Sequence, residues 1–483
     1  MISGFVGRAA ELGVLGVRLE RVRGSGRGTA VALRGRRQVG KSRLVQEFCD
    51  RAGVPYLYFT AVKGASPKES IASLLSDLRE FAMPRDRELV PGGNAANWLD
   101  AFRVVALALP ERPCIVVIDE SPWLAEQDQA FEGALQVAWD RLLSVRPVLL
   151  LLLGSDLHMM ERLTGYDRPF YGRADNLVLG PLNPAETSKA LAIEPQSAVD
   201  AHLITGGLPG ILRSWPTGDE PMSFVQRECA DPAASVFSVP ESSLLAEFPS
   251  PDQALRVLEA VGGGNRTYAN IAAAAGGSRV VPSGSLTPLL RRLVEDKRVL
   301  AIDEPLSTRP GRPALYRVAD SNLRMYLAIG RTAHDYARRG RPDEGFALLR
   351  RRWPAWRGRA VEPLVRESLA LACAMGSTPW PGAEVVGGWW NRQFDPEVDL
   401  VGADRSPVAG AISFAGSIKW LDTTFDGHDL TELTRNLRAI PGADPGATGI
   451  AVVSRSGLAP GLSGQVDLLW GPRDIVEAWD ASA

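Results

Sequence analysis

The chain has 483 residues, a length at which we expect about three domains of roughly 100 to 200 residues each and not one core. Hydrophobic residues make up 45% and charged residues 23%, which is typical of soluble globular proteins and gives no indication of disorder. The formal net charge of −2 excludes a protein held to nucleic acid by its overall charge, so any contact with DNA has to come from local basic patches.

The first part of the chain alternates short apolar runs with amphipathic segments, which is the pattern of a parallel sheet with helices on both faces. Five apolar runs are the expected strands: 29–35, 56–62, 114–120, 147–154 and 176–182. They predict an α/β domain over residues 1–182.

A phosphate-binding loop is predicted directly after the first of these strands. The residues that match the pattern GxxxxGK[ST] are Gly35, Arg36, Arg37, Gln38, Val39, Gly40, Lys41 and Ser42, and Arg43 follows them. The glycines allow a tight turn that points backbone N–H groups at phosphates, and the helix expected here adds the positive end of its dipole. Lys41 can reach the β- and γ-phosphates, and the Ser42 hydroxyl can ligate Mg²⁺. The loop therefore predicts ATP and Mg²⁺ as ligands.

Two carboxylates end the third expected strand. Asp119 and Glu120 follow four apolar β-formers, which brings them to the carboxyl edge of the sheet. We expect Asp119 to hold Mg²⁺ through water and Glu120 to act as the general base toward the attacking water. A site that binds ATP but hydrolyses it poorly remains open as an alternative.

The middle of the chain predicts two further modules. Residues 183–245 are expected to form a small helical lid that begins at Pro184 and is interrupted at the GGLPG segment 206–210. Residues 246–330 have the pattern of two helices, a third helix and a hairpin. That order is typical of a winged helix.

The winged-helix prediction includes a candidate DNA surface. Its basic residues in the third helix and the hairpin turn are Arg291, Arg292, Lys297, Arg298, Arg309 and Arg312. A helix of this kind can lie in the major groove, where arginine pairs with guanine edges. Glu295 and Asp296 lie in the same segment, so contact with DNA and packing against the nucleotide domain both remain open.

An arginine-rich helical connector is predicted over residues 331–357. Its basic cluster, which extends to position 359, consists of Arg338, Arg339, Arg341, Arg350, Arg351, Arg352, Arg357 and Arg359. A solvated basic face and a nucleic-acid surface are both compatible with such a run. From residue 358 to 483 the pattern returns to a helix, expected at 359–375, followed by strands expected at 390–394, 397–403, 410–420 and 449–454.

Six segments in order resemble the archaeal-type ATPase family, which belongs to the STAND-like branch of AAA-type P-loop ATPases. They are FVGRAAEL, GRRQVGKS, CIVVIDE, LLLLLGS, PFYGRADNLVLGPL and TGGLPGIL, and they span roughly residues 2–215. The resemblance implies that Phe5, Val6 and Arg8 lie near the adenine. It also implies that the segment from Gly207 to Pro209 closes the lid over the base.

The same resemblance assigns roles to two further polar residues. Ser155, at the end of the fourth expected strand, corresponds to the polar sensor of the family. Arg173 stands where the family places an arginine that faces the γ-phosphate, from the same subunit or from a neighbouring one. Such an arginine can accelerate phosphoryl transfer by about 10³ to 10⁵. A plain strand end and a surface arginine are the alternatives.

The last 125 residues or so resemble the restriction-endonuclease-like domain, of the PD-(D/E)XK type, that this ATPase family often carries. The residues that carry this resemblance are Glu362, Asp399 and Lys419. A working nuclease of this type needs a second acid two residues before the lysine to hold Mg²⁺, and here Ser417 occupies that position. A hydroxyl is a much weaker ligand for Mg²⁺ than a carboxylate. We therefore expect a degenerate site, with Glu362 as the candidate substitute ligand in an active one.

Two features of the sequence predict the cellular location of the protein. The start of the sequence lacks the basic segment and apolar run of a secretory signal, and the four cysteines form no CxxC pair, which indicates a cytoplasmic protein with reduced thiols. The longest apolar run, 147–154, is shorter than the roughly 18 to 20 residues that cross a bilayer, so no membrane contact is expected.

Together these patterns support three hypotheses. The leading one is an ATP-dependent switch that moves DNA- or partner-binding C-terminal modules. The second is an ATP-gated, Mg²⁺-dependent DNA nuclease. The third is a signalling or scaffold ATPase that binds only protein, including copies of itself. The patterns leave the oligomeric state open.

Overall fold

The structure is a computed structural model that describes residues 5–81, 95–155, 157–248, 253–277, 279–310 and 313–481. The chain divides into two compact units. One is Arg8–Pro181, and the other combines Met1–Gly7 with Leu182–Ala483. The predicted first domain, 1–182, thus corresponds to the unit Arg8–Pro181, while the segment before Arg8 belongs with the other unit.

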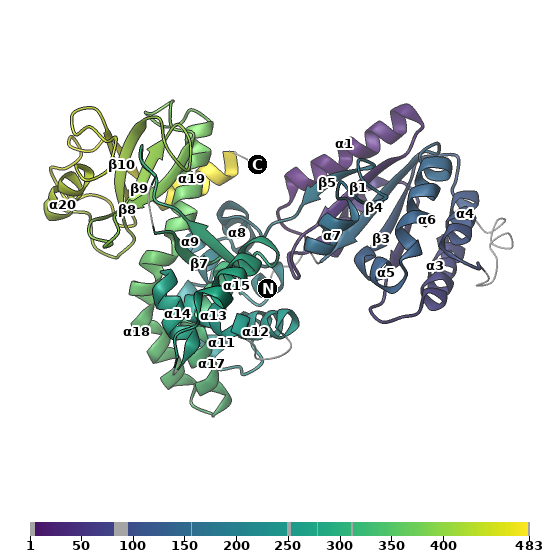
Figure 1. Ribbon diagram of the computed structural model, residues 1–483, viewed down its shortest axis with the longest axis horizontal. Helices are drawn as coiled ribbons and strands as arrows, with labels where there is room; N and C mark the ends of the chain where they lie inside the picture. The colour runs from purple at the N-terminus through teal and green to yellow at the C-terminus, as the bar shows by residue number, and fades with distance from the viewer. Residues whose placement is uncertain are drawn as a thin grey trace. The chain divides into compact units, whose positions relative to one another are not determined.

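A five-stranded parallel sheet forms the centre of the unit Arg8–Pro181 (Figure 1). Its strands are β1 (Thr29–Arg34), β2 (Tyr56–Thr60), β3 (Cys114–Asp119), β4 (Val148–Gly154) and β5 (Ala174–Val178), in the spatial order β2-β3-β4-β1-β5. The five predicted strands are confirmed. The last one was predicted at 176–182 but begins at Ala174 and ends at Val178, because the chain leaves the sheet before Gly180 and Pro181, neither of which favours a strand interior.

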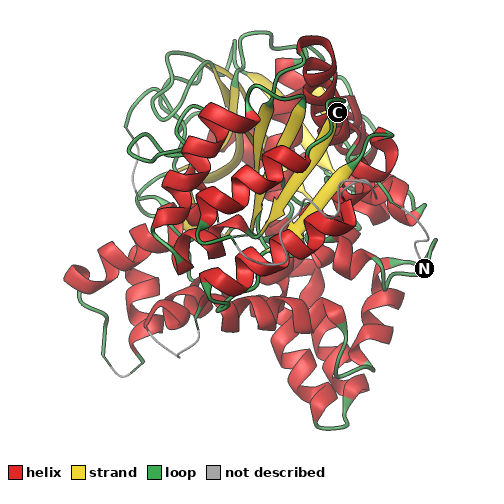
Figure 2. Ribbon diagram, turned by 90° about the vertical axis from the view of Figure 1, so that its right-hand side faces the viewer, coloured by secondary structure: helices red, strands yellow, loops and turns green. Residues whose placement is uncertain are grey.

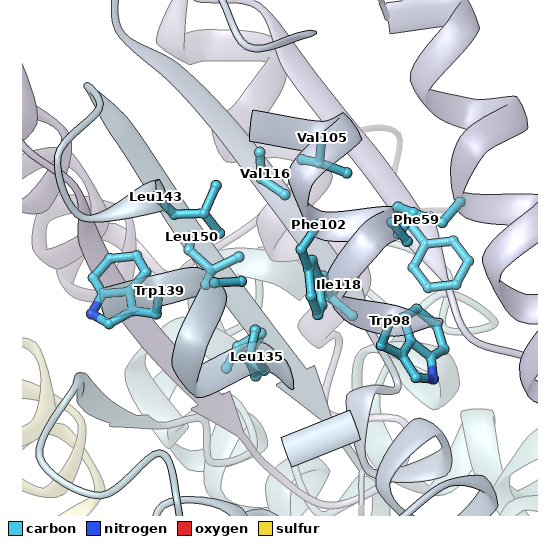
Figure 3. Close-up of a cluster of buried hydrophobic side chains, with 14 of the residues drawn as sticks. Phe59, Trp98, Phe102, Val105, Val116, Ile118, Leu135, Trp139, Leu143 and Leu150 are labelled. Atoms are coloured by element: carbon cyan, nitrogen blue, oxygen red, sulfur yellow. The ribbon is translucent and has the colours of Figure 1, made fainter. Parts of the chain in front are cut away.

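Helices flank this sheet, and Figure 2 shows them on either side of the strands. In chain order they are α1 (Ala9–Ser25), α2 (Lys41–Ala52), α3 (Pro67–Phe81), α4 (Trp98–Ala108), α5 (Ser121–Gln127), α6 (Ala130–Ala138), the π-helix η2 (Trp139–Leu143) and α7 (Leu157–Leu163). A large apolar cluster joins α4 and α6 to the sheet (Figure 3). Within it Trp98 packs edge-on against Phe131, with ring centroids 5.0 Å apart. This core fixes the strand ends that carry the polar residues.

Five helices begin the second unit, in the segment where the sequence predicts a helical lid. They are α8 (Pro184–Leu191), α9 (Pro195–Thr205), α10 (Pro209–Leu212), α11 (Pro221–Cys229) and α12 (Ser235–Glu247). The predicted break lies at Gly206 and Gly207, which both have positive φ angles of 64° and 65°. A Cβ atom on Gly207 would lie 2.0 Å from the carbonyl oxygen of Leu182, so only glycine fits this close backbone contact.

The next segment contains three helices followed by a hairpin, in the order predicted from the sequence. The elements are α13 (Gln253–Gly262), α14 (Tyr268–Gly276), α15 (Ser283–Glu295), β6 (Leu300–Asp303) and β7 (Leu315–Val318), and β6 pairs with β7 in the antiparallel sense. Their apolar faces share one core that includes Val257, Ile271 and Leu290. Arg312 of the predicted wing lies outside the described residues.

Four helices follow the hairpin. They are α16 (Ser321–Met325), the π-helix η3 (Tyr326–Gly330), α17 (Arg331–Arg338) and α18 (Pro342–Ala360). The predicted connector, 331–357, is helical as expected. Its last helix continues to Ala360, three residues past the boundary predicted from the sequence.

The C-terminal segment is a mixed five-stranded sheet with three helices. Its elements are α19 (Glu362–Ala374), β8 (Val385–Trp390), β9 (Glu397–Ala403), β10 (Ile412–Lys419), α20 (Gly427–Leu437), β11 (Gly449–Ser454), β12 (Leu468–Trp470) and α21 (Pro472–Ala481). The spatial order is β12-β11-β10-β9-β8, parallel from β12 to β10 and antiparallel from β10 to β8.

One predicted strand in this segment is wrong. The expected strand 390–394 shares only Trp390 with β8, which comes earlier in the chain. The Asn391 side chain ends the strand, because its Oδ1 accepts hydrogen bonds from the backbone N–H groups of Gln393 and Asp395 and so forms a local turn.

Helix α9 is the centre of this second unit. All its residues from Ala198 to Thr205 are buried, as expected for a helix surrounded by other elements. It packs against α8, α16 and α21. Across the described residues, we find no helix with the length and apolar character needed to span a bilayer.

Candidate functional site

The loop 35–42, the carboxylates 119–120 and Ser155 lie at one edge of the parallel sheet. The loop follows β1, the carboxylates end β3, and Ser155 follows β4, which lies between β1 and β3. Because parallel strands present their carboxyl ends at the same edge, the sheet brings these three segments together. This is the edge that the sequence predicted.

The backbone of the loop has the conformation that an anion-binding turn requires. Gln38 and Gly40 have positive φ angles of 67° and 91°, and helix α2 begins at Lys41. A Cβ atom on Gly35 would lie 2.4 Å from the carbonyl oxygen of Leu179, so glycine is required where the loop leaves β1. The loop therefore combines a turn of backbone N–H groups with a helix N-terminus, the arrangement that binds phosphate.

Lys41 is buried and lies inside the loop. Its Nζ donates hydrogen bonds to the carbonyl oxygens of Gly35, at 2.6 Å, and Arg36, at 3.1 Å. Burial lowers the pKa of Lys41 to about 8, and the opposing effect of Glu120 and Asp119 raises it only in part. Phosphate oxygens would offer this ammonium stronger acceptors than two neutral carbonyls, because hydrogen bonds between ions are the stronger kind.

Ser42 and Asp119 are in direct contact, so their oxygens lie close enough together to bind one metal ion. The Ser42 hydroxyl donates to Asp119 Oδ2 at 2.7 Å. Mg²⁺ in nucleotide sites is held by one or two protein oxygens of this kind, together with phosphate oxygens and waters. One hydroxyl and one carboxylate beside a phosphate loop therefore fit Mg²⁺ bound with a nucleotide. A third protein ligand is not needed, and among the residues described none of the His, Cys, Asp and Glu side chains gather in groups of three that could hold a metal by themselves.

The sequence analysis missed Tyr58, which shares this carboxylate. Its hydroxyl donates to Asp119 Oδ2 at 2.9 Å from the neighbouring strand β2. Burial, followed by the charge of Asp119, raises the pKa of Tyr58, so it stays a neutral donor. The only available signal was a tyrosine in a strand that pairs with the strand of Asp119, and the pairing is not visible in the sequence.

Glu120 and Ser155 are also brought together. The Ser155 hydroxyl donates to Glu120 Oε1, and its backbone N–H lies 3.4 Å from Oε2. Glu120 adopts a left-handed backbone conformation with φ 55° directly before helix α5. Left-handed residues other than glycine are uncommon, and they concentrate at functional sites. The roles of general base and sensor stay predictions.

Arg173 is bound within its own unit. Its guanidinium forms two hydrogen bonds of 2.8 Å to the Asp140 carboxylate, and Nη1 donates to the carbonyl oxygens of Pro169 and Tyr171. The Arg173 hydrogen bonds hold the pKa of Asp140 below its usual value. A role at a γ-phosphate therefore requires Arg173 to leave Asp140, and that role stays a prediction.

The remaining residues predicted to bind nucleotide are placed as follows. Arg36 is half-buried, Arg37 and Arg43 are exposed, and Arg43 pairs with Glu47 at 3.1 Å. Arg8 is buried and its guanidinium donates to the carbonyl oxygen of Val39 within the loop. Phe5, Val6 and Pro209 belong to the other unit, where Phe5 and Val6 are half-buried and Pro209 begins α10.

A second polar pocket lies in the C-terminal segment. It has a volume of about 410 Å³, and Glu362, Asp399 and Lys419 all line it. The structure thus gathers the three residues predicted for the degenerate nuclease site. Arg266, which precedes α14, and Arg359, on α18, line it as well.

The acids of this pocket do not fit a Mg²⁺ site. Asp399 Oδ2 accepts hydrogen bonds from the Ser417 hydroxyl, at 3.0 Å, and from the backbone N–H of Ile418, at 2.8 Å. Burial and the nearby charge of Glu362 raise the pKa of Asp399 to about 6. A metal ion bound by Asp399 would have to compete with these two hydrogen bonds, which makes the carboxylate a poor metal ligand.

Lys419 is engaged by a residue that the sequence analysis missed. Its Nζ donates to Asp429 Oδ2, on α20, at 2.5 Å. Asp429 is also the third helical residue of α20 and accepts from the backbone N–H of Asp426. The sequence shows Asp429 only as a capping residue, so its contact with Lys419 could not be predicted. This ion pair keeps the ammonium away from the role of orienting a water.

Comparison with known proteins finds a family likeness for the stretch that contains the phosphate loop. Residues 4–151 match the family described as AAA ATPase domain, and this stretch contains the loop and both carboxylates. The unit Arg8–Pro181 is thus similar to an AAA ATPase domain in sequence, and it has the parallel sheet predicted for a P-loop domain. A comparison with curated protein sequences finds no match.

Three solved structures show weaker likenesses. The Walker-type ATPase of Pyrococcus abyssi is 20% identical with a TM-score of 0.49, and the alignment covers 67% of this chain and 96% of that one. Cdc6p of Pyrobaculum aerophilum is 13% identical with a TM-score of 0.33, and the alignment covers 71% of this chain and 97% of that one. Orc1 of Aeropyrum pernix, in a structure of its complex with DNA, is 14% identical with a TM-score of 0.31. That alignment covers 70% of this chain and 94% of the other. At TM-scores below 0.5, no conclusion about activity or partners follows from these likenesses.

Proposed function

We propose that this chain hydrolyses ATP and uses the nucleotide state to move its C-terminal modules, which bind DNA. The observation that carries the proposal is the pairing of Ser42 with Asp119 and of Glu120 with Ser155 at the edge where the phosphate loop lies. These contacts support a metal-binding role for Ser42 and Asp119 and a base role for Glu120 beside one phosphate loop, the groups that a P-loop ATPase uses.

The proposed reaction assigns one task to each side chain. A water attacks the γ-phosphorus while Glu120 accepts a proton from it, and the bond between the γ-phosphorus and the bridging oxygen breaks to give ADP and phosphate. Lys41 and the N–H groups of the loop stabilise the negative charge on the phosphate oxygens. Ser42 and Asp119 would hold Mg²⁺, which would supply positive charge against the phosphates. Ser155 holds the Glu120 carboxylate by hydrogen bonding.

Buried polar contacts within the second unit support the idea that its modules move together. The Asn322 side chain, at the start of α16, donates to the carbonyl oxygens of Ile204 in α9 and Val236 in α12. Asp200 of α9 accepts from Arg357 of α18 at 3.1 Å and from Arg455, after β11, at 3.2 Å. The lid helices are thus bonded to both the winged-helix segment and the C-terminal segment. A movement of the lid would carry both.

Two basic surfaces support DNA as the partner. Arg291 and Arg292 are exposed on α15, the helix predicted to enter the groove, although Arg291 also pairs with Glu295 at 2.8 Å. On α18 the run 350–352 is exposed, and within the described part of the chain none of its three arginines forms an ion pair with an acid. Other members of the predicted cluster are neutralised, since Arg338 pairs with Glu241 and Arg357 is buried on Asp200.

The nuclease alternative is not favoured by the pocket around Asp399, because its carboxylate and its lysine are both engaged within the protein. The alternative of a partner that is protein alone makes a different prediction about salt. Contacts with DNA phosphates lower log K linearly with log salt, with a slope near −0.9 for each phosphate contact, whereas a protein partner has no condensed counterions to release and gives a weaker dependence on salt.

The deciding experiment measures ATP turnover by the purified chain, with and without duplex DNA, over a range of salt concentrations. The proposal expects turnover that requires Lys41 and Glu120, and DNA binding that weakens steeply with salt. A triple exchange of Arg350, Arg351 and Arg352 to Gln should reduce the salt slope, by about one for each of these arginines that binds a phosphate. Absence of turnover in every condition would refute the ATPase, and salt-independent or absent DNA binding would refute DNA as the partner.

A further inference from the structure

Arg8 connects the phosphate loop to the place where the chain leaves the ATPase unit. The residue is only 4% exposed, and its Nη2 donates to two carbonyl oxygens, that of Val39 in the loop at 2.9 Å and that of Gly180 at 2.8 Å. Its Nη1 pairs with Glu11 in α1 at 3.0 Å. One guanidinium group therefore bridges two backbone segments that are far apart in the sequence.

The bridged carbonyl in the loop is one that shapes the phosphate site. Val39 lies between Gln38 and Gly40, which both have left-handed backbones. In such a turn the N–H groups can face a phosphate only if the carbonyl oxygens point the other way. A buried cation that donates to the Val39 carbonyl stabilises that orientation. A hydrogen bond from a charged group contributes more than one from a neutral donor.

The other bridged carbonyl precedes a crossing between the two units. The chain passes from one unit to the other twice, between Gly7 and Arg8 and between Pro181 and Leu182. Arg8 is the first residue after one crossing, and Gly180 comes just before the other. The loop also touches this exit directly, because Gly35 lies against the carbonyl of Leu179. Both crossings are thus attached to the phosphate loop inside the ATPase unit.

The backbone of Arg8 indicates that this position is constrained. Its φ angle is 67°, in the left-handed region, and α1 begins at the next residue. A residue other than glycine in this region carries strain that the surrounding contacts have to maintain. The side-chain bonds to Val39 and Gly180 are contacts of that kind.

We propose that Arg8 is a positioning residue that transmits the occupancy of the phosphate loop to both chain crossings. This inference rests on the proposed switch and deepens it by naming the connection. When phosphate binds, the loop N–H groups and the carbonyl of Val39 shift as one peptide framework, and Arg8 carries the shift to Gly180 and to its own backbone. The role differs from contact with the adenine, which the sequence resemblance implied for this residue.

The test compares Arg8→Met, Arg8→Lys and a matched control in the full-length chain. Arg18→Met is the control, because Arg18 also lies in the α1 region and also reaches toward β5, through an ion pair of 2.5 Å with Asp175, but is separate from the loop. Fluorophores placed at Leu107→Cys and Val280→Cys, both well exposed, report the distance between the two units by energy transfer. The four native cysteines are buried and so remain unlabelled.

The proposal expects three results. Arg8→Met should bind ATP about tenfold more weakly or worse, in line with the loss of a charged hydrogen bond. At saturating ATP, it should also show less than about half of the nucleotide-dependent change in energy transfer that the parent chain shows. Arg8→Lys keeps the charge but places its donors on a shorter side chain without the planar guanidinium. It should recover affinity more than it recovers the change in energy transfer, and Arg18→Met should match the parent in both.

Two outcomes separate failure of this inference from failure of the proposed switch. If the parent chain responds to ATP and Arg8→Met responds fully with unchanged affinity, the role of Arg8 is refuted and the switch stands. If the parent shows no change with ATP, the switch is refuted, and so is the transmission by Arg8. If thermal unfolding shows that Arg8→Met does not fold, Arg8→Lys provides the same comparison. The proposal is then overturned if Arg8→Lys equals Arg18→Met in both ATP affinity and the change in energy transfer.

Discussion

Exchange of Asp399 for Asn should stabilise the second unit at neutral pH. Asp399 lies in the wall of the C-terminal pocket, where burial, with the charge of Glu362, raises its pKa from 3.8 to about 6. Each unit of pKa difference between the folded and unfolded states corresponds to about 1.36 kcal/mol, so ionisation of Asp399 costs the folded state about 3 kcal/mol. The amide oxygen of Asn can accept the hydrogen bonds from Ser417 and Ile418 that Asp399 accepts now.

The sign of the pH dependence follows from the raised pKa. The contribution of Asp399 to stability is fully present below the unfolded pKa of 3.8 and is lost as pH rises through about 6. Asn does not titrate. The free energy of unfolding of Asp399→Asn relative to the parent should therefore increase by about 3 kcal/mol between about pH 4 and about pH 8, with most of the change between those two pKa values. Urea unfolding of the full-length chains at a series of pH values measures this difference.

Asp404 offers a control with the opposite sign. This carboxylate accepts hydrogen bonds from the backbone N–H groups of Ala411 and Gly410, and these bonds lower its pKa. Asp404→Asn should be less stable than the parent at neutral pH, and the deficit should vanish as pH falls through the lowered pKa, which lies below 3.8. If Asp399→Asn is instead less stable at pH 8, or if its advantage does not depend on pH, Asp399 is an ordinary ionised carboxylate and our interpretation of the pocket is wrong.

Four substitutions test the two sites more directly. Lys41→Ala should abolish ATP binding, since it removes the ammonium from within the loop; unchanged nucleotide affinity in a binding titration would contradict the site. Glu120→Gln should keep ATP binding and lose turnover in a phosphate-release assay, because an amide cannot accept the proton of the water; surviving turnover would mean that another base acts. Arg173→Ala should slow hydrolysis without weakening ATP binding. Mixing this variant with Glu120→Gln protein should restore part of the activity if the arginine acts between subunits. Unchanged hydrolysis by Arg173→Ala would leave Arg173 as the structural partner of Asp140. The parent should not cleave DNA with Mg²⁺ or Mn²⁺, whereas Ser417→Glu restores the missing acid and should give at most weak cleavage; robust cleavage by the parent that depends on its C-terminal pocket would overturn the degenerate site.

The sequence predicted which segments meet at the strand edge because its signals are local. Eight consecutive residues specify the loop, and an apolar run that ends in two acids specifies the strand edge, so the meeting of Ser42 with Asp119 follows from the rule that parallel strands end at one edge. The contact of Tyr58 with the same carboxylate could not be predicted in this way. It depends on β2 lying beside β3, a pairing that the sequence does not encode locally.

In the C-terminal pocket, too, some residues were predictable from the sequence and others were not. Glu362, Asp399 and Lys419 were found through the resemblance to a nuclease motif, and they do line one pocket. Asp429 was missed because it looks like an ordinary capping residue of α20, and its contact with Lys419 depends on how that helix packs on the sheet. The wrong strand at 390–394 has a different cause, since the chain was expected to be extended where the side chain of Asn391 forms a turn.

The buried charges around Asp200 limit how the proposed switch can work. Asp200 and Arg357 are 5% and 4% exposed and Arg455 is 13% exposed, so these three side chains are largely shielded from solvent. The exposed Asp422 brings a second negative charge to the two arginines. Burial tends to raise the pKa of Asp200, and the two arginines oppose this. Separating the C-terminal segment from α9 would take Arg455 away from Asp200, and removing one partner of a buried ion pair typically costs about 3 to 5 kcal/mol. That is comparable with the free energy by which a ligand shifts a two-state equilibrium from one side to the other, about 5.5 kcal/mol. A nucleotide-driven change that separated these segments would have to break the Asp200 group, so the second unit is expected to move as one body.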